Sequence, residues 1–257
     1  MGFETVDFEG TFRRLIDLKT WDDETVVAWL EDDNHHFGLT LVHDGLVIKD
    51  LRAEMPRFPW GTCPGAVQPL RALIGRPLFG RCSEVGRYLD MRQQCTHLFD
   101  LAGLAAAHAF HHRVHHRYHA MVTRHDEREP GGPPDWLHAS LLRDEREVMW
   151  WNLCGATMMR PASAAGQSTD RGFREWTEKL DESSAEHAFV LRRAVFVARA
   201  RTRNYTAARS PAEMGLPPVC HTHQPEIRPR ARRVGDNYYI RWDAGSAGML
   251  ARADTKP

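Results

Sequence analysis

Three side chains of catalytic type open one predicted helix, at residues 95–100 with the sequence Cys-Thr-His-Leu-Phe-Asp. Unsatisfied N–H groups and the positive end of the helix dipole lower the pKa of a thiol or an imidazole there. His97 and Asp100 are three residues apart, so the carboxylate can hold the ring in one tautomer, as a general base requires. We therefore predict acid–base chemistry with His97 as the base. In the alternative interpretation Thr96 caps the helix, Asp100 complements the dipole, and His97 only packs.

Six histidines fall within residues 108–119, and this tract can be placed in two ways. On a continued helix, one face would carry a surface of metal-ligand type formed by His108, His112, His115 and His119. On a strand from residue 114 to 125, one face would carry His115, His119 and His125, and the other His116, Tyr118 and Val122. β-branched and aromatic residues increase after residue 114, so we predict a helix to about His112 followed by a strand. Tyr118 then becomes a candidate acid or hydroxyl-orienting group.

A metal site is the main alternative to acid–base chemistry alone. His221 and His223 share one face of an extended segment, and a zinc site needs a third ligand, for which the histidine tract offers candidates. The alternative ligand set, for zinc or another divalent metal, is His115, His119, His221 and His223. Neither an HExxH motif nor a glycine-rich phosphate loop occurs, so the primary expectation is that no cofactor is used.

The predicted fold is a single α+β domain over residues 1–257, with an antiparallel sheet packed against several helices. Residues 25–55 alternate as a three-stranded meander with a turn at Asp44-Gly45. Further strands are predicted at 114–125, 136–142, 148–159 and 237–242, and helices at 66–74, 96–111 and 173–203. From about residue 206 the chain is rich in loops.

The candidate pocket is walled by aromatic and histidine side chains, predicted to be Trp60, Trp136, Trp151 and His36. Arg57 follows a proline within a rigid loop that contains three prolines, and is predicted to stabilise developing negative charge. One or two arginines of the stretch 192–209 could also face inward and clamp a carboxylate or phenolate. The remaining candidates are His115 and His119, from the tract.

Composition excludes several classes of partner. The 34 acidic and 34 basic side chains balance, so a nucleic-acid partner is not expected. No stretch is apolar enough for a membrane span or a signal core, and the five cysteines are widely spaced without a CxxC pair. We expect a cytoplasmic protein with reduced thiols that forms a homodimer, the commonest oligomer.

Four segments together resemble an uncharacterised bacterial family, a domain of unknown function. They are residues 32–37 (Asp-Asp-Asn-His-His-Phe), 57–63 (Arg-Phe-Pro-Trp-Gly-Thr-Cys), 95–101 (Cys-Thr-His-Leu-Phe-Asp-Leu) and 220–226 (Cys-His-Thr-His-Gln-Pro-Glu). The resemblance spans residues 10–240, and the chain departs from it at His221 and His223, where aromatic residues are expected. It implies cytoplasmic proteins of bacteria with wide catabolic capacity, including degraders of aromatic compounds.

The combined expectation is a cofactor-independent lyase that acts on an aromatic, lignin-derived compound by elimination or by C–C cleavage such as deformylation. In it His97 or a histidine of the tract removes a proton, Asp100 orients it, Arg57 stabilises negative charge, and Tyr118 protonates or positions the substrate. A metal-dependent hydrolase or lyase, and a ligand-binding protein without turnover, remain as alternatives.

Overall fold

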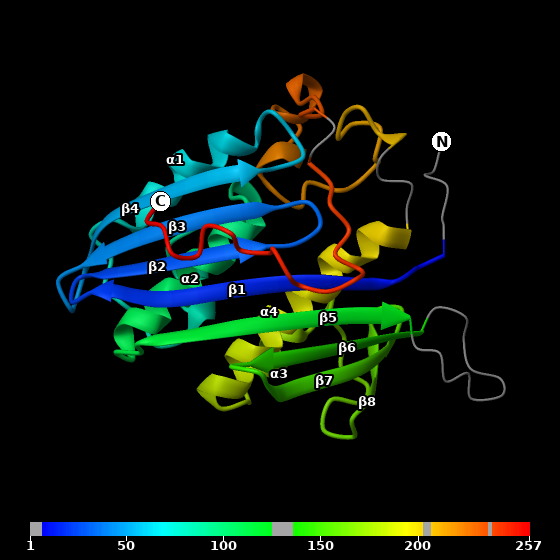
Figure 1. The fold of residues 1–257 in the computed structure, drawn as a ribbon, viewed down its shortest axis with the longest axis horizontal. Helices are drawn as coiled ribbons and strands as arrows, with labels where there is room; N and C mark the ends of the chain where they lie inside the picture. Colours follow the sequence, from blue (N-terminus) through cyan, green and yellow to red (C-terminus); the bar gives the residue numbers. More distant parts are fainter. Residues whose placement is uncertain (1–6, 125–135, 203–206, 236–237) are drawn as a thin grey trace.

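An eight-stranded antiparallel sheet forms the centre of the computed structural model, which describes residues 7–124, 136–202, 207–235 and 238–257. Its strand order is β4-β3-β2-β1-β5-β6-β7-β8, so the chain builds one half outward from β1 and then the other (Figure 1). The strands are β1 Thr11–Asp22, β2 Thr25–Glu31, β3 His36–His43, β4 Ile48–Arg57, β5 His115–Arg124, β6 Trp136–Arg143, β7 Arg146–Cys154 and β8 Thr157–Arg160.

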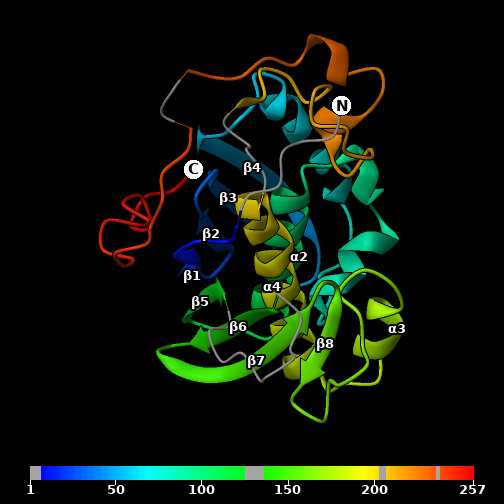
Figure 2. The ribbon, with the colours of Figure 1, turned by 90° about the vertical axis from the view of Figure 1, so that its right-hand side faces the viewer.

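Two long helices cover one face of this sheet (Figure 2). Helix α2 (Thr96–Phe110) packs across β1, β2 and β3, and α4 (Glu182–Ala198) packs mainly across β5, β6 and β7. The shorter helices are α1 Val67–Leu70 and α3 Phe173–Thr177, and 3₁₀ turns occur at Cys63–Ala66, Arg71–Leu73, Cys82–Arg87, Met91–Gln93, Arg199–Thr202, His221–His223 and Arg228–Arg230. The predicted α+β class, with an antiparallel sheet against helices in a single body, is confirmed. In the described ranges, no helix combines the length and apolar composition needed to cross a bilayer.

Strand β1 places a charged side chain in the core. Phe12, Arg14, Ile16 and Leu18 alternate onto the helix-covered face, and each is at most 2% exposed. Three of them join the main apolar core between sheet and helices, whereas Arg14 brings a guanidinium into it. Because this strand mixes charged and apolar residues on both faces, it was not predicted.

The C-terminal segment crosses the opposite face of the sheet (Figures 1 and 2). Met249 and Leu250 pack on Leu15, Val27 and Trp29. The Trp29 ring N–H donates to the Thr255 carbonyl at 2.9 Å, and the Leu250 amide donates to Glu31. Both faces of β2 are therefore covered, which explains why the whole strand is buried.

Most predicted elements are confirmed, with four corrections. The single strand predicted at 148–159 is two paired strands, β7 and β8, joined by a turn at residues 155–156. The meander is present as β2, β3 and β4, and the strand after the histidine tract is β5, with His125 outside the described residues. The predicted helix over 173–203 is two helices, because the Asp181 side chain accepts the Ser184 amide and starts α4 as a new N-cap. Thr96 lies inside α2, whose N-cap position is Cys95, and residues 238–242 form no strand.

Candidate active site

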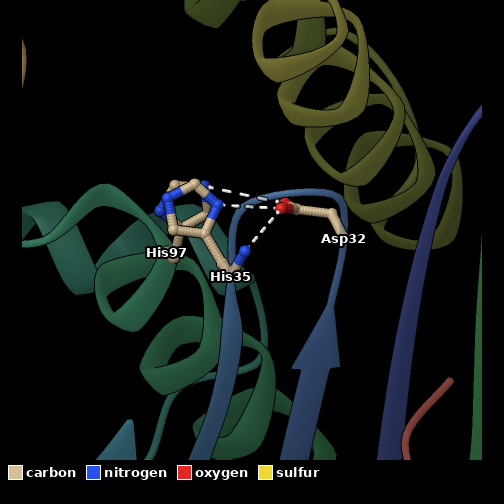
Figure 3. A group of neighbouring side chains, drawn as sticks. All are labelled: Asp32, His35 and His97. Carbon is tan, nitrogen blue, oxygen red and sulfur yellow. Dashed lines mark hydrogen bonds and ion pairs between the residues drawn. The ribbon is translucent and has the colours of Figure 1, made fainter. Parts of the chain in front are cut away.

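The turn between β2 and β3 is built around the carboxylate of Asp32. One oxygen, Oδ1, accepts the backbone N–H groups of Asn34 at 2.9 Å and His35 at 3.0 Å. The same oxygen lies 2.8 Å from Nδ1 of the His35 ring (Figure 3). A carboxylate on Nδ1 keeps the proton there and leaves Nε2 as the basic atom. Asp32 and His35 therefore have the arrangement of a catalytic Asp–His dyad.

Arg14 binds the second oxygen of the same carboxylate. Its Nη1 donates to Asp32 Oδ2 at 2.5 Å, and both side chains are fully buried. Burial alone would raise the pKa of Asp32, but His35 and Arg14 beside it hold that pKa far below its usual range. Asp32 is thus a carboxylate at neutral pH, as the dyad requires.

His97 of α2 completes the cluster by stacking on the His35 ring, with ring centres 3.8 Å apart (Figure 3). Its Nε2 is 4.0 Å from Asp32 Oδ2, and its Nδ1 is 3.7 Å from the Cys95 sulfur. Burial, together with His35 and Arg14, lowers the pKa of His97 well below the ordinary histidine value. His97 is therefore a neutral ring that flanks the dyad.

Asp32, His35 and His97 are also candidate metal ligands, since their donor atoms all lie within 4.8 Å of one another. They form the one such group of histidine, cysteine or acidic residues that the described part of the chain contains. An imidazole binds a metal about 2 Å away along its lone pair, close to the ring plane. The two stacked rings, inclined by 31°, each direct one nitrogen at the Asp32 carboxylate itself, at 2.8 Å from His35 and 4.0 Å from His97 (Figure 3). As arranged, the cluster suits proton transfer better than metal binding.

Two arginines hold the turn from outside. Arg57 of β4 donates to the carbonyls of Asp32 and Asp33, each at 2.6 Å, and pairs with Glu31 at 2.8 Å. Arg201 grips the carboxylate of Asp33 through two contacts of 2.7 and 3.1 Å. These contacts give Arg57 a positioning role for the dyad turn.

A cavity of about 440 Å³ lies between the sheet and the helices, within the size range of small-molecule pockets. Its wall includes Arg14 of β1, Phe99 and Asp100 of α2, and Phe189 and Arg193 of α4. Arg14 therefore contacts both the cavity and the dyad. The rest of the wall mixes apolar side chains such as Ile16, Leu104 and Phe173, which suit an apolar ring, with charged ones such as Asp90, Asp170 and Arg192.

Asp100 does not orient His97 as the sequence predicted. Its carboxylate is instead gripped by Arg193, with Nε–Oδ2 at 2.5 Å and Nη2–Oδ1 at 3.2 Å. The carboxylate nearest to His97 comes from Asp32, 65 positions earlier in the chain. Arg193 confirms that an arginine of the stretch 192–209 faces inward.

Tyr118 lies in a second buried cluster, on β5. Its hydroxyl donates to Glu186 at 2.5 Å, and Arg113 binds the same carboxylate through contacts of 2.9 and 3.1 Å. The ring is fully buried, and the cavity wall does not include it. His116 and His108 stack beside it, 5.0 Å apart.

The other predicted site residues are dispersed. His115 pairs with Asp17 on the outer face of β5, together with half-buried His119, while His221 and His223 lie in a 3₁₀ turn whose first amide donates to the Gln94 carbonyl. None of the four predicted pocket-wall residues is among the residues that line the described cavity. Trp60 faces Arg233, and His36 packs edge-on against Trp29. Trp151 packs on Phe173 and Trp176, and Trp136 begins β6.

The sequence analysis missed the roles of Arg14, Asp32 and His35. The available signal was the spacing of Asp32 and His35, three residues apart in a tight turn and inside a segment already singled out by resemblance. No sequence pattern around Arg14 indicates its contact with that turn, which lies 18 residues later.

Three of the four segments that carried the resemblance meet at this site, and the fourth contacts the second. The turn at 32–37 holds the dyad, Arg57 binds it, and the segment at 95–101 supplies His97. Thr222 of the fourth segment reaches Cys63 at 3.6 Å.

Comparison with known proteins agrees with this convergence. A family model described as "Protein of unknown function (DUF2889)" matches residues 5–111, a stretch that includes Arg14, the dyad and His97. The comparison with curated proteins gave no match. The match stops well short of residue 240, so it supports the resemblance for three of the four segments. The family model of DUF2889, a domain of unknown function, thus covers residues 5–111 of this chain.

Proposed function

We propose that this protein is a cofactor-independent lyase that applies general acid–base chemistry to a small aromatic substrate. The observation that supports it most is the Asp32–His35 dyad, whose carboxylate also binds a cavity-wall arginine. Free imidazole Nε2 in such a dyad is a general base, and a nearby guanidinium stabilises developing negative charge. The proposal assigns the base to His35, in place of His97.

A C–C cleavage illustrates the proposed chemistry. His35 Nε2 takes the proton of a substrate hydroxyl, and the O–H electron pair becomes the second bond of a carbonyl as the neighbouring C–C bond breaks. The electron pair of the broken C–C bond stays on the other carbon, which then receives the proton back from His35. A hydroxymethyl substituent would leave as formaldehyde, which is the deformylation expected from the sequence.

The test is aldehyde release from aromatic compounds that carry a hydroxymethyl side chain. His35→Gln should lower the rate by a factor of about 10² or more, the usual contribution of a positioned base. His112→Asn, at an exposed histidine after α2, is the control and should leave the rate unchanged. Full activity in His35→Gln would refute the assignment of the base. Ligand binding without any product from the wild type would favour a non-catalytic binding protein.

A metal-dependent lyase at Asp32, His35 and His97 is the second candidate, favoured by the convergence of their donor atoms. Elemental analysis of protein purified without a histidine tag separates the two. Near one equivalent of zinc, iron or manganese, lost in His35→Gln together with activity, would replace the acid–base proposal. We further propose a cytoplasmic setting, consistent with five free cysteines. The homodimer stays a prediction.

A further inference from the structure

Arg14 has an unused pair of donors at the cavity. Its Nη1 is occupied by Asp32, but neither Nε nor Nη2 has a hydrogen-bond partner among the described residues. Arg14 is 1% exposed, so water cannot reach these N–H groups freely as it would at a surface. Buried donors without a partner destabilise the folded protein, and that cost calls for an acceptor.

The two free nitrogens form a specific recognition element. Nε and Nη2 lie on one edge of the planar guanidinium and present two nearly parallel N–H bonds. This edge matches the two oxygens of a carboxylate, which arginine binds as a bidentate pair. A hydroxyl or an amide would satisfy it only in part.

The other arginines of the wall, Arg174, Arg192 and Arg193, each already donate to an acceptor of the protein. In Arg193 of α4, Nε and Nη2 both donate to the carboxylate of Asp100 on α2, so this edge of the guanidinium is already occupied. Phe99 and Phe189 line the same cavity and supply faces for an aromatic ring. The wall thus combines a buried guanidinium edge, for which no partner is found among the described residues, with apolar side chains.

We infer that the cavity binds an aromatic carboxylate, with its carboxylate on the Nε–Nη2 edge of Arg14. The occupant would be the substrate of the proposed lyase, so this assignment of substrate class rests on the proposed function. The ligand's negative charge would also offset the Arg14 charge beside the dyad. Arg14 then has two roles, one oriented to Asp32 and one to the ligand.

The experiment is calorimetric titration of the full chain with benzoate, and with benzamide as a neutral analogue of similar shape. Benzoate should bind, and benzamide should bind at least tenfold more weakly. Arg14→Lys keeps the charge but loses the paired edge, and should weaken benzoate by about 100-fold. Arg52→Gln, at an exposed arginine of β4 that does not line the cavity, is the control and should bind as the wild type does.

Equal binding of benzoate and benzamide to the wild type, or no binding of benzoate, would overturn the inference without requiring any variant to fold. If Arg14→Lys does not fold, that comparison decides alone. His35→Gln separates this inference from the proposed function, since it should lower the rate of turnover by a factor of about 10² or more and still bind benzoate. Benzoate binding in a protein that turns nothing over would therefore refute the lyase and leave the carboxylate site intact.

Discussion

The buried pair His116 and His108 should make the fold sensitive to mild acid. Burial, together with His108 and the guanidinium groups of Arg143 and Arg113, lowers the pKa of His116 to about 2. Both His116 ring nitrogens lack a hydrogen-bond partner among the described residues. The nearest carboxylate, Glu186, is 4.0 Å away and already bound by Arg113. The folded protein therefore strongly favours the neutral ring.

The size of the effect follows from linkage between protonation and folding. A histidine of the unfolded chain takes up a proton below its ordinary pKa near 6.5, whereas folded His116 stays neutral to about pH 2. Its stabilising contribution is thus complete above pH 6.5 and is lost as the pH falls. At pH 5, about 1.5 pH units below the ordinary value, the loss is about 2 kcal/mol at about 1.4 kcal/mol per unit. His108, with a pKa lowered to about 4 by burial, should lose a similar amount.

His116→Phe tests this reasoning, because the ring stacking is kept while both nitrogens are removed. The free energy of unfolding, from urea denaturation followed by tryptophan fluorescence, should fall between pH 7 and pH 5 by about 2 kcal/mol less than in the wild type. His112→Asn is the control and should keep the wild-type pH dependence. An unchanged pH dependence in His116→Phe would show that desolvation of this ring does not govern acid stability.

Three further results are expected. Arg201→Met should lower the free energy of unfolding by about 3–5 kcal/mol in urea denaturation, because it strands the buried carboxylate of Asp33. Gly103→Ala, which would favour helix α2 by intrinsic propensity, should instead lower the melting temperature, since the added Cβ would collide with the Cys82 carbonyl oxygen. Benzoate binding should be accompanied by proton uptake at acid pH, measured as a dependence of the calorimetric heat on the buffer. Burial and His35 keep the pKa of His97 low, and neutralising Arg14 weakens a further cause.

The local parts of the fold were predictable, because periodicity and turn chemistry act over a few residues. The meander at 25–55 follows from alternation and from Asp44-Gly45, where Gly45 adopts a φ of 90°. The split between α3 and α4 depends on one N-cap, Asp181, inside a pattern that otherwise continues the helix. Strand β1 was missed because Arg14 interrupts its apolar face, and the reason for that arginine lies 18 residues away.

The candidate site was predictable only in its components. Proximity in sequence suggested that Asp100 serves His97, but the helix turns Asp100 toward Arg193 on a neighbouring helix. The spacing in sequence would have predicted the contact of Asp32 with His35, since the two residues are three apart in one tight turn. Contacts such as His97 with Asp32 depend on how α2 docks on the sheet, which no local pattern encodes.

The carboxylate of Asp32 closes a turn of the fold, orients the proposed base and binds an arginine of the cavity wall. Asp32 Oδ1 closes the β2–β3 turn and holds His35, while Oδ2 holds Arg14. Removing this side chain would strand a buried guanidinium as well as release the imidazole, so a defect in Asp32→Asn could not distinguish catalysis from folding. Variants at the two partners act on one contact each. Because His35→Gln should affect proton transfer and Arg14→Lys should affect ligand recognition, the two partners can separate functions that Asp32 combines.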